Sequence, residues 1–179
     1  MWGPRPRATE RNSSSSERVE MGTIVTASAE ETERLGEILA PLLRAGDVVA
    51  LSGDLGAGKT RLVQGVARGL GIADAVTSPT FNLLLVHPAP VPLYHFDLYR
   101  LEREDELGDI GFFETIESDG VSLIEWGDRF PDALPPAHLS VVIHRTGEAE
   151  RHFEIVGHGD RAAHLAREWQ AAWAAEVHG

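Results

Sequence analysis

The chain has 179 residues, of which 42% are hydrophobic and 25% charged, and these proportions indicate one globular domain. It has no cysteine, which excludes a disulfide scaffold, zinc–thiolate sites and thiol chemistry. The formal net charge of −12 argues against a protein that binds nucleic acid through a broad basic surface of its own. No apolar run approaches the roughly 20 residues that a membrane span requires, so we expect none.

The first residues differ in composition from the rest of the chain. Arginines and glutamates are scattered among residues 1–21, a run of four serines occupies 13–16, and no hydrophobic stretch follows the arginines. This composition is typical of a disordered segment and unlike a secretory signal. We therefore predict a disordered N-terminal extension over 1–21 and a single folded domain over 22–179.

The folded part begins with alternating strand and helix signals. Residues 23–26 are prone to form a β-strand, and Ser28 and Glu31 have the spacing of a capping box. Apolar residues then recur at helical period up to Leu42, and Gly46-Asp47 is expected to end the helix. Residues 48–52 form a continuous apolar run, the pattern of a strand that is covered on both faces.

The remaining segments continue this alternation. We expect strands over 81–86, 93–98, 121–126, 139–144 and 152–156, a helix after the glycine-rich loop, mixed helix and turn over 101–119, and a final helix over 162–177. Trp169 and Trp173 lie on the apolar stripe of the final helix, where packing into the core is the expected role. One α/β domain with a central sheet flanked by helices accounts for these elements.

A glycine-rich loop after the apolar strand carries the strongest functional signal. It has the pattern Gly-x-x-x-x-Gly-Lys-Thr between a strand and a helix, which is the signature of a phosphate-binding P-loop. Glycines let the backbone turn tightly and present its amide N–H groups to phosphate oxygens, and the following helix directs its positive end at the same anion. The predicted nucleotide-binding residues of the loop are Gly53, Asp54, Leu55, Gly56, Ala57, Gly58, Lys59 and Thr60.

Lys59 is the only lysine among the 16 basic residues of the chain. A lysine ammonium is a compact, flexible point charge, which suits a position between phosphates and a tight backbone loop. In a P-loop it reaches the β- and γ-phosphates, and the hydroxyl of the next residue, here Thr60, ligates the bridging Mg²⁺.

Two carboxylates are candidate functional residues beside the loop. Glu125 follows an apolar run directly, as a magnesium-binding acid at a strand end would, although an ordinary strand-end carboxylate has the same pattern. Asp97 shares one face of an alternating strand with His95 and Tyr99. From the pattern alone, that polar face could equally be solvated.

Taken in order, these motifs resemble the TsaE family, the small P-loop ATPases of bacterial threonylcarbamoyladenosine tRNA modification. Besides the loop, the resemblance is carried by Ser78-Pro79-Thr80-Phe81, by 95–101 with the sequence His-Phe-Asp-Leu-Tyr-Arg-Leu, and by Ile124-Glu125-Trp126. It covers roughly residues 23–156. Many NTPases share the loop, whereas the combination with the second and third blocks is specific to this family.

The resemblance implies a P-loop NTPase-like fold, with ATP or ADP and Mg²⁺ as cofactors. Thr60 and Glu125 match the metal-binding positions, Ser78 and Thr80 match a switch-like segment near the γ-phosphate, and Asp97 matches a residue important for hydrolysis. The expected catalytic residues are therefore Lys59 and Asp97. The family is cytoplasmic, its ATPase is weak, and it acts with the partner proteins TsaB and TsaD, of which TsaD performs the transfer itself.

One position in the loop departs from the family pattern. The residue after the loop hydroxyl is often a second threonine that is available to the α-phosphate, and here it is Arg61.

Residues 101–128 contain ten acidic residues and one arginine, hence a net charge of −9 in 28 residues. This segment is either a solvated face or a docking surface for a basic protein, and in both cases it should repel tRNA, so we expect tRNA contact mainly through the partners.

Two other functions share the loop and stay open from the sequence. One is a P-loop kinase that passes the γ-phosphoryl group to a small molecule. The other is a nucleotide-dependent switch that changes partners without relevant hydrolysis.

Overall fold

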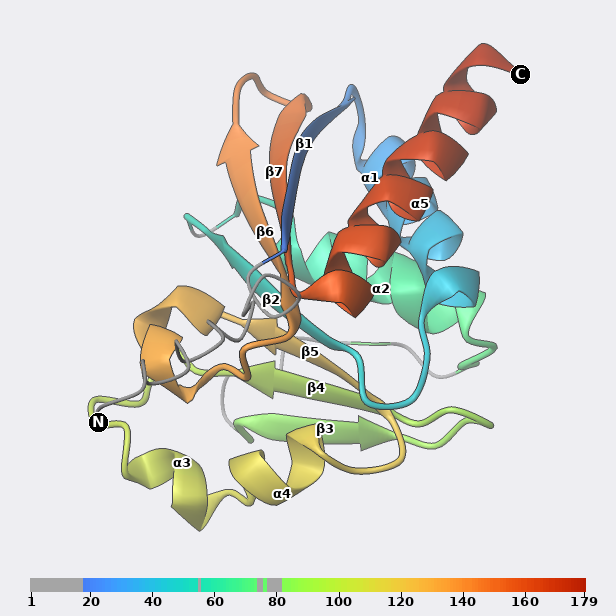
Figure 1. The fold of residues 1–179 in the computed structure, drawn as a ribbon. Helices are drawn as coiled ribbons and strands as arrows, with labels where there is room; N and C mark the ends of the chain where they lie inside the picture. The colour runs from blue at the N-terminus through green and yellow to red at the C-terminus, as the bar shows by residue number, and fades with distance from the viewer. Residues whose placement is uncertain (1–17, 55, 74–75, 77–81) are drawn as a thin grey trace, which may run out of the picture.

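The computed structural model describes residues 18–54, 56–73, 76 and 82–179, and a seven-stranded mixed sheet forms its centre (Figure 1). The strands are β1 (Val19–Thr26), β2 (Val48–Gly53), β3 (Leu84–His87), β4 (Leu93–Asp97), β5 (Val121–Glu125), β6 (His138–Arg145) and β7 (Arg151–His158). The α-helices are α1 (Ala29–Leu39), α2 (Lys59–Gly69), α3 (Glu106–Asp109), α4 (Phe112–Ile116) and α5 (Asp160–His178). Short 3₁₀ turns are η2 (Ala40–Leu42), η3 (Gly127–Arg129) and η4 (Pro131–Ala133).

The strand order is β1-β7-β6-β2-β5-β4-β3, and the central strands run parallel. β2 pairs in parallel with both β5 and β6, and β5 pairs in parallel with β4. The outer strands β1, β7 and β3 pair antiparallel with their neighbours. The carboxyl ends of β2, β4, β5 and β6 therefore meet at one edge of the sheet, the usual place for a ligand site in an α/β fold.

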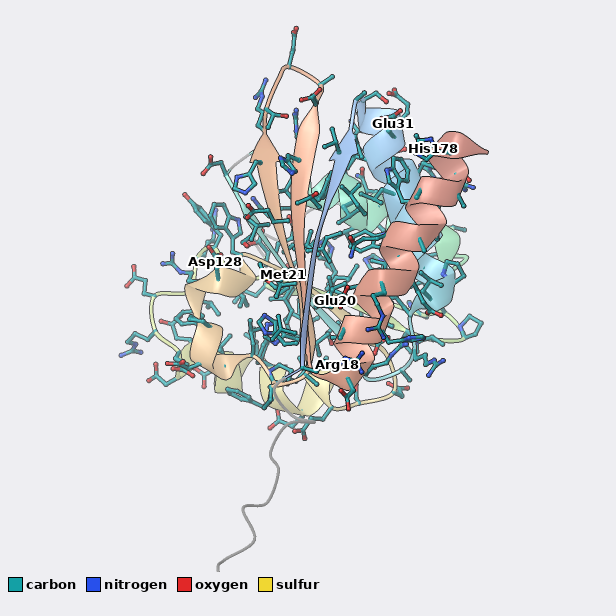
Figure 2. All side chains as sticks on the ribbon, turned by 45° about the horizontal axis from the view of Figure 1, so that its top comes forward. Arg18, Glu20, Met21, Glu31, Asp128 and His178 are labelled. Atoms are coloured by element: carbon teal, nitrogen blue, oxygen red, sulfur yellow. The ribbon has the colours of Figure 1, made fainter. Side chains whose placement is uncertain are left out.

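Helices cover the two faces of the sheet unequally. α1, α2 and α5 lie on one face over the main hydrophobic core, and α3 and α4 lie on the other face beside β4 and β5 (Figure 1). The second face is not covered by a described helix over β1, where Val19, Met21 and Val25 are exposed (Met21 is labelled in Figure 2). No described helix is both long enough and apolar enough to cross a bilayer.

Most of the expected elements are present, and the expected single α/β domain is confirmed. Ser28 caps α1 by accepting a hydrogen bond from the Glu31 amide at 3.1 Å, as the capping-box spacing predicted. Trp169 is fully buried and donates its indole N–H to the Leu35 carbonyl at 3.1 Å, which confirms its role in the core.

Several boundaries differ from the expectation. β1 begins at Val19, so residues 19–21, which we assigned to the N-terminal extension, pair with β7; residues 1–17 lie outside the described residues. α1 ends at Leu39, well before Gly46, because Pro41 cannot continue the α-helical hydrogen bonds and instead lies in η2. β5 ends at Glu125, and Trp126 leaves the strand with φ of 60°.

Candidate functional site

The glycine-rich loop connects β2 to α2 at the carboxyl edge of the sheet, as predicted. Gly56 and Gly58 have φ of 78° and 112°, a region that favours glycine. Gly53 has φ of 135°, and a Cβ at this position would lie 2.4 Å from the Ile143 carbonyl oxygen on β6. Backbone conformation and close packing therefore explain these glycines, while Leu55 lies outside the described residues.

Lys59 begins α2 and is almost completely buried. Its ammonium donates hydrogen bonds to the Gly53 carbonyl and, at 2.8 Å, to the Asp54 carbonyl. The Trp126 ring lies against it, with 4.2 Å from Nζ to the ring centroid. Burial lowers the pKa of the Lys59 ammonium, and the negative charges of Glu125 and Asp97 oppose this effect. The loop thus holds one cation in a confined position that faces carboxylates.

Glu125 joins the end of β5 to the loop. Its Oε1 accepts a hydrogen bond from the Thr60 hydroxyl at 3.0 Å, and its Oε2 lies 2.5 Å from Nε2 of His95. Glu125 is only 3% exposed and His95 is 0% exposed. The carboxylate therefore makes close contacts through both oxygens, to side chains from two different elements.

Asp97 ends β4 directly beside Glu125, because these two residues are partners in the parallel β4–β5 register. It is 3% exposed, and its Oδ1 accepts a hydrogen bond from the Tyr99 amide at 3.0 Å. His95 is buried as well, whereas Tyr99 lies beyond the strand and is 43% exposed. The possibility of a solvated polar face on β4 is therefore wrong for His95 and Asp97.

Two aromatic rings lie beside the loop. Trp126 adopts the left-handed backbone conformation, which is unusual for a bulky residue, and this conformation directs the chain into η3 directly after Glu125. The Tyr99 ring packs against the Trp126 ring with a centroid distance of 4.9 Å. Asp128, labelled in Figure 2, follows in η3 and is exposed. The Trp126 ring therefore borders the lysine, and the Tyr99 ring packs against the Trp126 ring.

The residues present fit a magnesium site of the P-loop type. Mg²⁺ prefers oxygen ligands and is held in such proteins by a loop hydroxyl, an acidic residue and the substrate phosphates. Thr60 and Glu125 supply the hydroxyl and carboxylate oxygens, already within hydrogen-bond distance of each other. No group of three or more His, Asp or Glu side chains arranged to hold a metal occurs among the described residues. A site that also needs substrate phosphates does not require one.

Arg151, which the sequence did not single out, ties the loop to the β6–β7 hairpin. Its Nε donates to the Ala57 carbonyl at 2.9 Å, and its Nη1 donates to the Glu150 carbonyl at 2.8 Å. Arg151 also lines a pocket of about 240 Å³, together with Gly58 and Arg61. Arg61 itself is paired with Glu33 of α1 at 2.8 Å. The expected sites Ser78 and Thr80 lie outside the described residues.

The comparisons with known proteins agree on one family. The family model described as "Threonylcarbamoyl adenosine biosynthesis protein TsaE" matches residues 26–153. This chain belongs to the TsaE family. The match includes every described site residue and none of residues 1–25, and it ends within β7.

Relatives from several bacteria carry the name tRNA threonylcarbamoyladenosine biosynthesis protein TsaE. The one from Bacillus subtilis is 42% identical over 144 residues, which are 80% of this chain and 90% of the relative. The one from Streptomyces coelicolor is 45% identical over 137 residues, 72% of this chain and 92% of the relative. The crystal structure of Bacillus subtilis YdiB superimposes with a TM-score of 0.75 at 34% identity, covering 87% of this chain and 98% of YdiB.

These similarities confirm the expected family and the P-loop NTPase-like fold. The sequence had also indicated which side chains share the site. The structure brings Lys59, Thr60, Asp97 and Glu125 to one edge of the sheet, as expected, and adds His95 and Arg151 to them.

Proposed function

We propose that this protein is a weak, magnesium-dependent ATPase that acts with TsaB and TsaD in the threonylcarbamoyladenosine modification of tRNA. In this role it supports repeated turnover of the modification, and TsaD performs the transfer. The observation that carries the proposal is the hydrogen bond from Thr60 to Glu125 beside the buried Lys59, in a chain of the TsaE family. It joins the end of a phosphate-binding loop to an acid on a neighbouring strand, the arrangement that nucleotide hydrolysis with Mg²⁺ requires.

Each residue of the site has its own role in the proposed hydrolysis. Backbone amides of the loop and the Lys59 ammonium bind the β- and γ-phosphates and stabilise the charge that spreads over the transferring phosphoryl group. When bound, Mg²⁺ supplies Lewis-acid stabilisation of the phosphate oxygens, and Thr60 and Glu125 would hold it. Asp97 positions the attacking water: the water oxygen bonds to the γ-phosphorus, the bond to the bridging oxygen breaks, and the water's proton passes to the carboxylate.

The acidic residues of 101–128 favour contact with proteins over direct contact with tRNA. Eight of these ten carboxylates are exposed: Glu102, Glu104, Asp105, Asp109, Glu114, Glu117, Asp119 and Asp128. Such a surface repels a polyanion and attracts a basic protein surface. We therefore expect the isolated chain to bind tRNA weakly at physiological salt, and tight binding there would contradict this part of the proposal.

The central experiment combines hydrolysis with the cellular product. Phosphate release is measured with the purified chain, TsaB, TsaD and ATP, with and without Mg²⁺, and tRNA nucleosides from cells depleted of the protein are analysed by mass spectrometry. We expect partner-stimulated, Mg²⁺-dependent hydrolysis and a loss of threonylcarbamoyladenosine. An undiminished level of the modified nucleoside, in cells with no redundant ATPase, would overturn the proposal.

The two alternative functions give different results in the same system. A kinase would form ADP only when a small-molecule acceptor is added. A non-hydrolysing switch would support the modification equally well with the Asp97→Ala variant, because it would not need positioned water. Loss of both hydrolysis and modification in that variant would support the ATPase.

A further inference from the structure

His95 is a buried polar side chain that the proposed mechanism does not use. It lies on β4, two residues before Asp97, and its side chain faces the same side of the sheet as Glu125. It is 0% exposed, and its Nε2 is 2.5 Å from Glu125 Oε2. Its other ring nitrogen, Nδ1, is buried without a hydrogen-bond partner among the described residues. The hydrogen bond with Glu125 is therefore the one that the His95 ring makes among the described residues.

We propose that His95 is a positioning residue: it donates its Nε2–H to Glu125 and fixes the carboxylate in the orientation that meets Thr60 and a bound Mg²⁺. This role rests on the proposed function, and deepens it. Glu125 Oε2 is held by His95, so Oε1 stays directed at the Thr60 hydroxyl, 3.0 Å away. Side chains that orient a metal-binding carboxylate in this way typically change metal affinity by about 10- to 100-fold when they are replaced.

The proton belongs on Nε2. A carboxylate oxygen accepts hydrogen bonds, so Nε2 donates in the contact with Glu125 Oε2, and Nδ1 has no hydrogen-bond partner among the described residues. An imidazole N–H orients the Glu125 carboxylate through a single hydrogen bond. An arginine in the same place would cancel the charge that attracts a divalent cation.

The experiment measures nucleotide affinity by calorimetry, with and without Mg²⁺, using a non-hydrolysable ATP analogue. We expect His95→Phe to reduce the Mg²⁺-dependent gain in affinity about 10-fold while the metal-free affinity is unchanged. His95→Gln keeps an N–H donor and should recover most of the gain. His138→Phe is the matched control, since His138 is a partly buried strand histidine that bonds to the Pro135 carbonyl at 2.7 Å, far along the chain from the loop.

A double-mutant cycle separates positioning from general damage to the fold. In a Glu125→Gln background, His95→Phe should cause no further loss of the Mg²⁺-dependent gain, because the two residues act through one contact. Additive losses, or equal losses with and without Mg²⁺, would overturn the role of His95. A wild-type protein whose nucleotide affinity ignores Mg²⁺ would instead overturn the proposed function itself.

A measurement on the unaltered apoprotein keeps the test valid even if the variants do not fold. Imidazole ¹⁵N chemical shifts report which ring nitrogen carries the proton. We expect a proton on Nε2 of His95, and a ring without a proton on Nε2 would contradict the proposal.

Discussion

Two clusters of charged side chains near α2 contrast sharply. In the site, Glu125 and Asp97 are buried, and the described contacts of Glu125 are with Thr60 and His95. On the outer surface, Glu33 and Glu37 of α1 are each paired with two arginines, in a network that comprises Arg34, Arg61, Arg68 and Glu176. The outer carboxylates are thus paired with arginines, whereas Glu125 contacts a hydroxyl and an imidazole, and the Lys59 ammonium faces both buried carboxylates.

The contrast shows how the same residue types serve different ends. Exposed ion pairs contribute little to stability because water and salt screen them, and each is worth about 0–1 kcal/mol. A buried charge interacts strongly with the charges of a ligand that binds beside it, because little water is present to screen the field. We therefore expect substitutions in the site to change ATP hydrolysis greatly. Substitutions in the outer network should change the free energy of unfolding only slightly.

The largest expected effect is that of Lys59→Arg, which keeps the charge. The planar guanidinium is bulkier than the ammonium that contacts the Gly53 and Asp54 carbonyls and the Trp126 ring. We expect partner-stimulated ATP hydrolysis to fall about 10²- to 10³-fold, the usual loss when one charge-stabilising group is displaced. The control is Arg68→Lys, an exchange on the exposed face of the same helix, and near-normal hydrolysis by Lys59→Arg would refute the expectation.

The next effect concerns Asp97. Asp97→Asn has the same shape and still accepts a hydrogen bond from the Tyr99 amide, but it cannot take a proton from water. We expect hydrolysis to fall about 10²-fold, with nucleotide affinity nearly unchanged. Asp128→Asn removes an exposed carboxylate nearby and serves as the control. Equal loss in the two variants would mean that overall charge, and not the position of Asp97, matters.

The smallest effect is expected in the outer network. Glu33→Gln removes the negative partner of Arg61 and Arg68, and we expect a loss of roughly 0.2–1 kcal/mol in the free energy of unfolding, measured by urea denaturation. Adding salt should shrink the difference from the wild type. A loss several times larger would show that this network is less screened than its exposure indicates.

The same network predicts a pH dependence. Hydrogen bonding to Arg61 lowers the pKa of Glu33, and hydrogen bonding to Arg34 and Arg68 lowers the pKa of Glu37, from the ordinary value of 4.5. The folded state therefore binds fewer protons than the unfolded state below pH 4.5. The stabilisation is complete above that pH and is lost as the pH falls through the lowered values. The stability difference between wild type and Glu33→Gln should accordingly shrink below pH 4.5, and a difference that grows instead would contradict this sign.

The sequence predicted the loop and its two flanking elements well, because each depends on residues that are adjacent along the chain. The apolar run before Gly53 and the helix after Gly58 are local patterns. The proximity of Glu125 to Thr60 was expected from the behaviour of P-loop proteins, whereas the contact of Glu125 with His95 depends on the parallel register of β4 and β5. A single sequence does not specify such a register.

Contacts between distant segments explain what the sequence missed. Arg151 reaches Ala57 across 94 residues, and nothing in its neighbourhood in the sequence distinguishes it from the other arginines. The early start of β1 at Val19 has the same origin, because residues 19–21 are held by pairing with β7 and not by strong local β-propensity.

The position of Trp126 gives the protein an intrinsic optical reporter. Its indole lies against the Lys59 ammonium, where a bound phosphate would change its surroundings, whereas Trp169 and Trp173 are packed in the core. Fluorescence from the core indoles should stay constant as the loop fills, and emission from Trp126 should shift. Occupancy of the loop could then be followed in real time without a label, with the two core tryptophans as an internal standard.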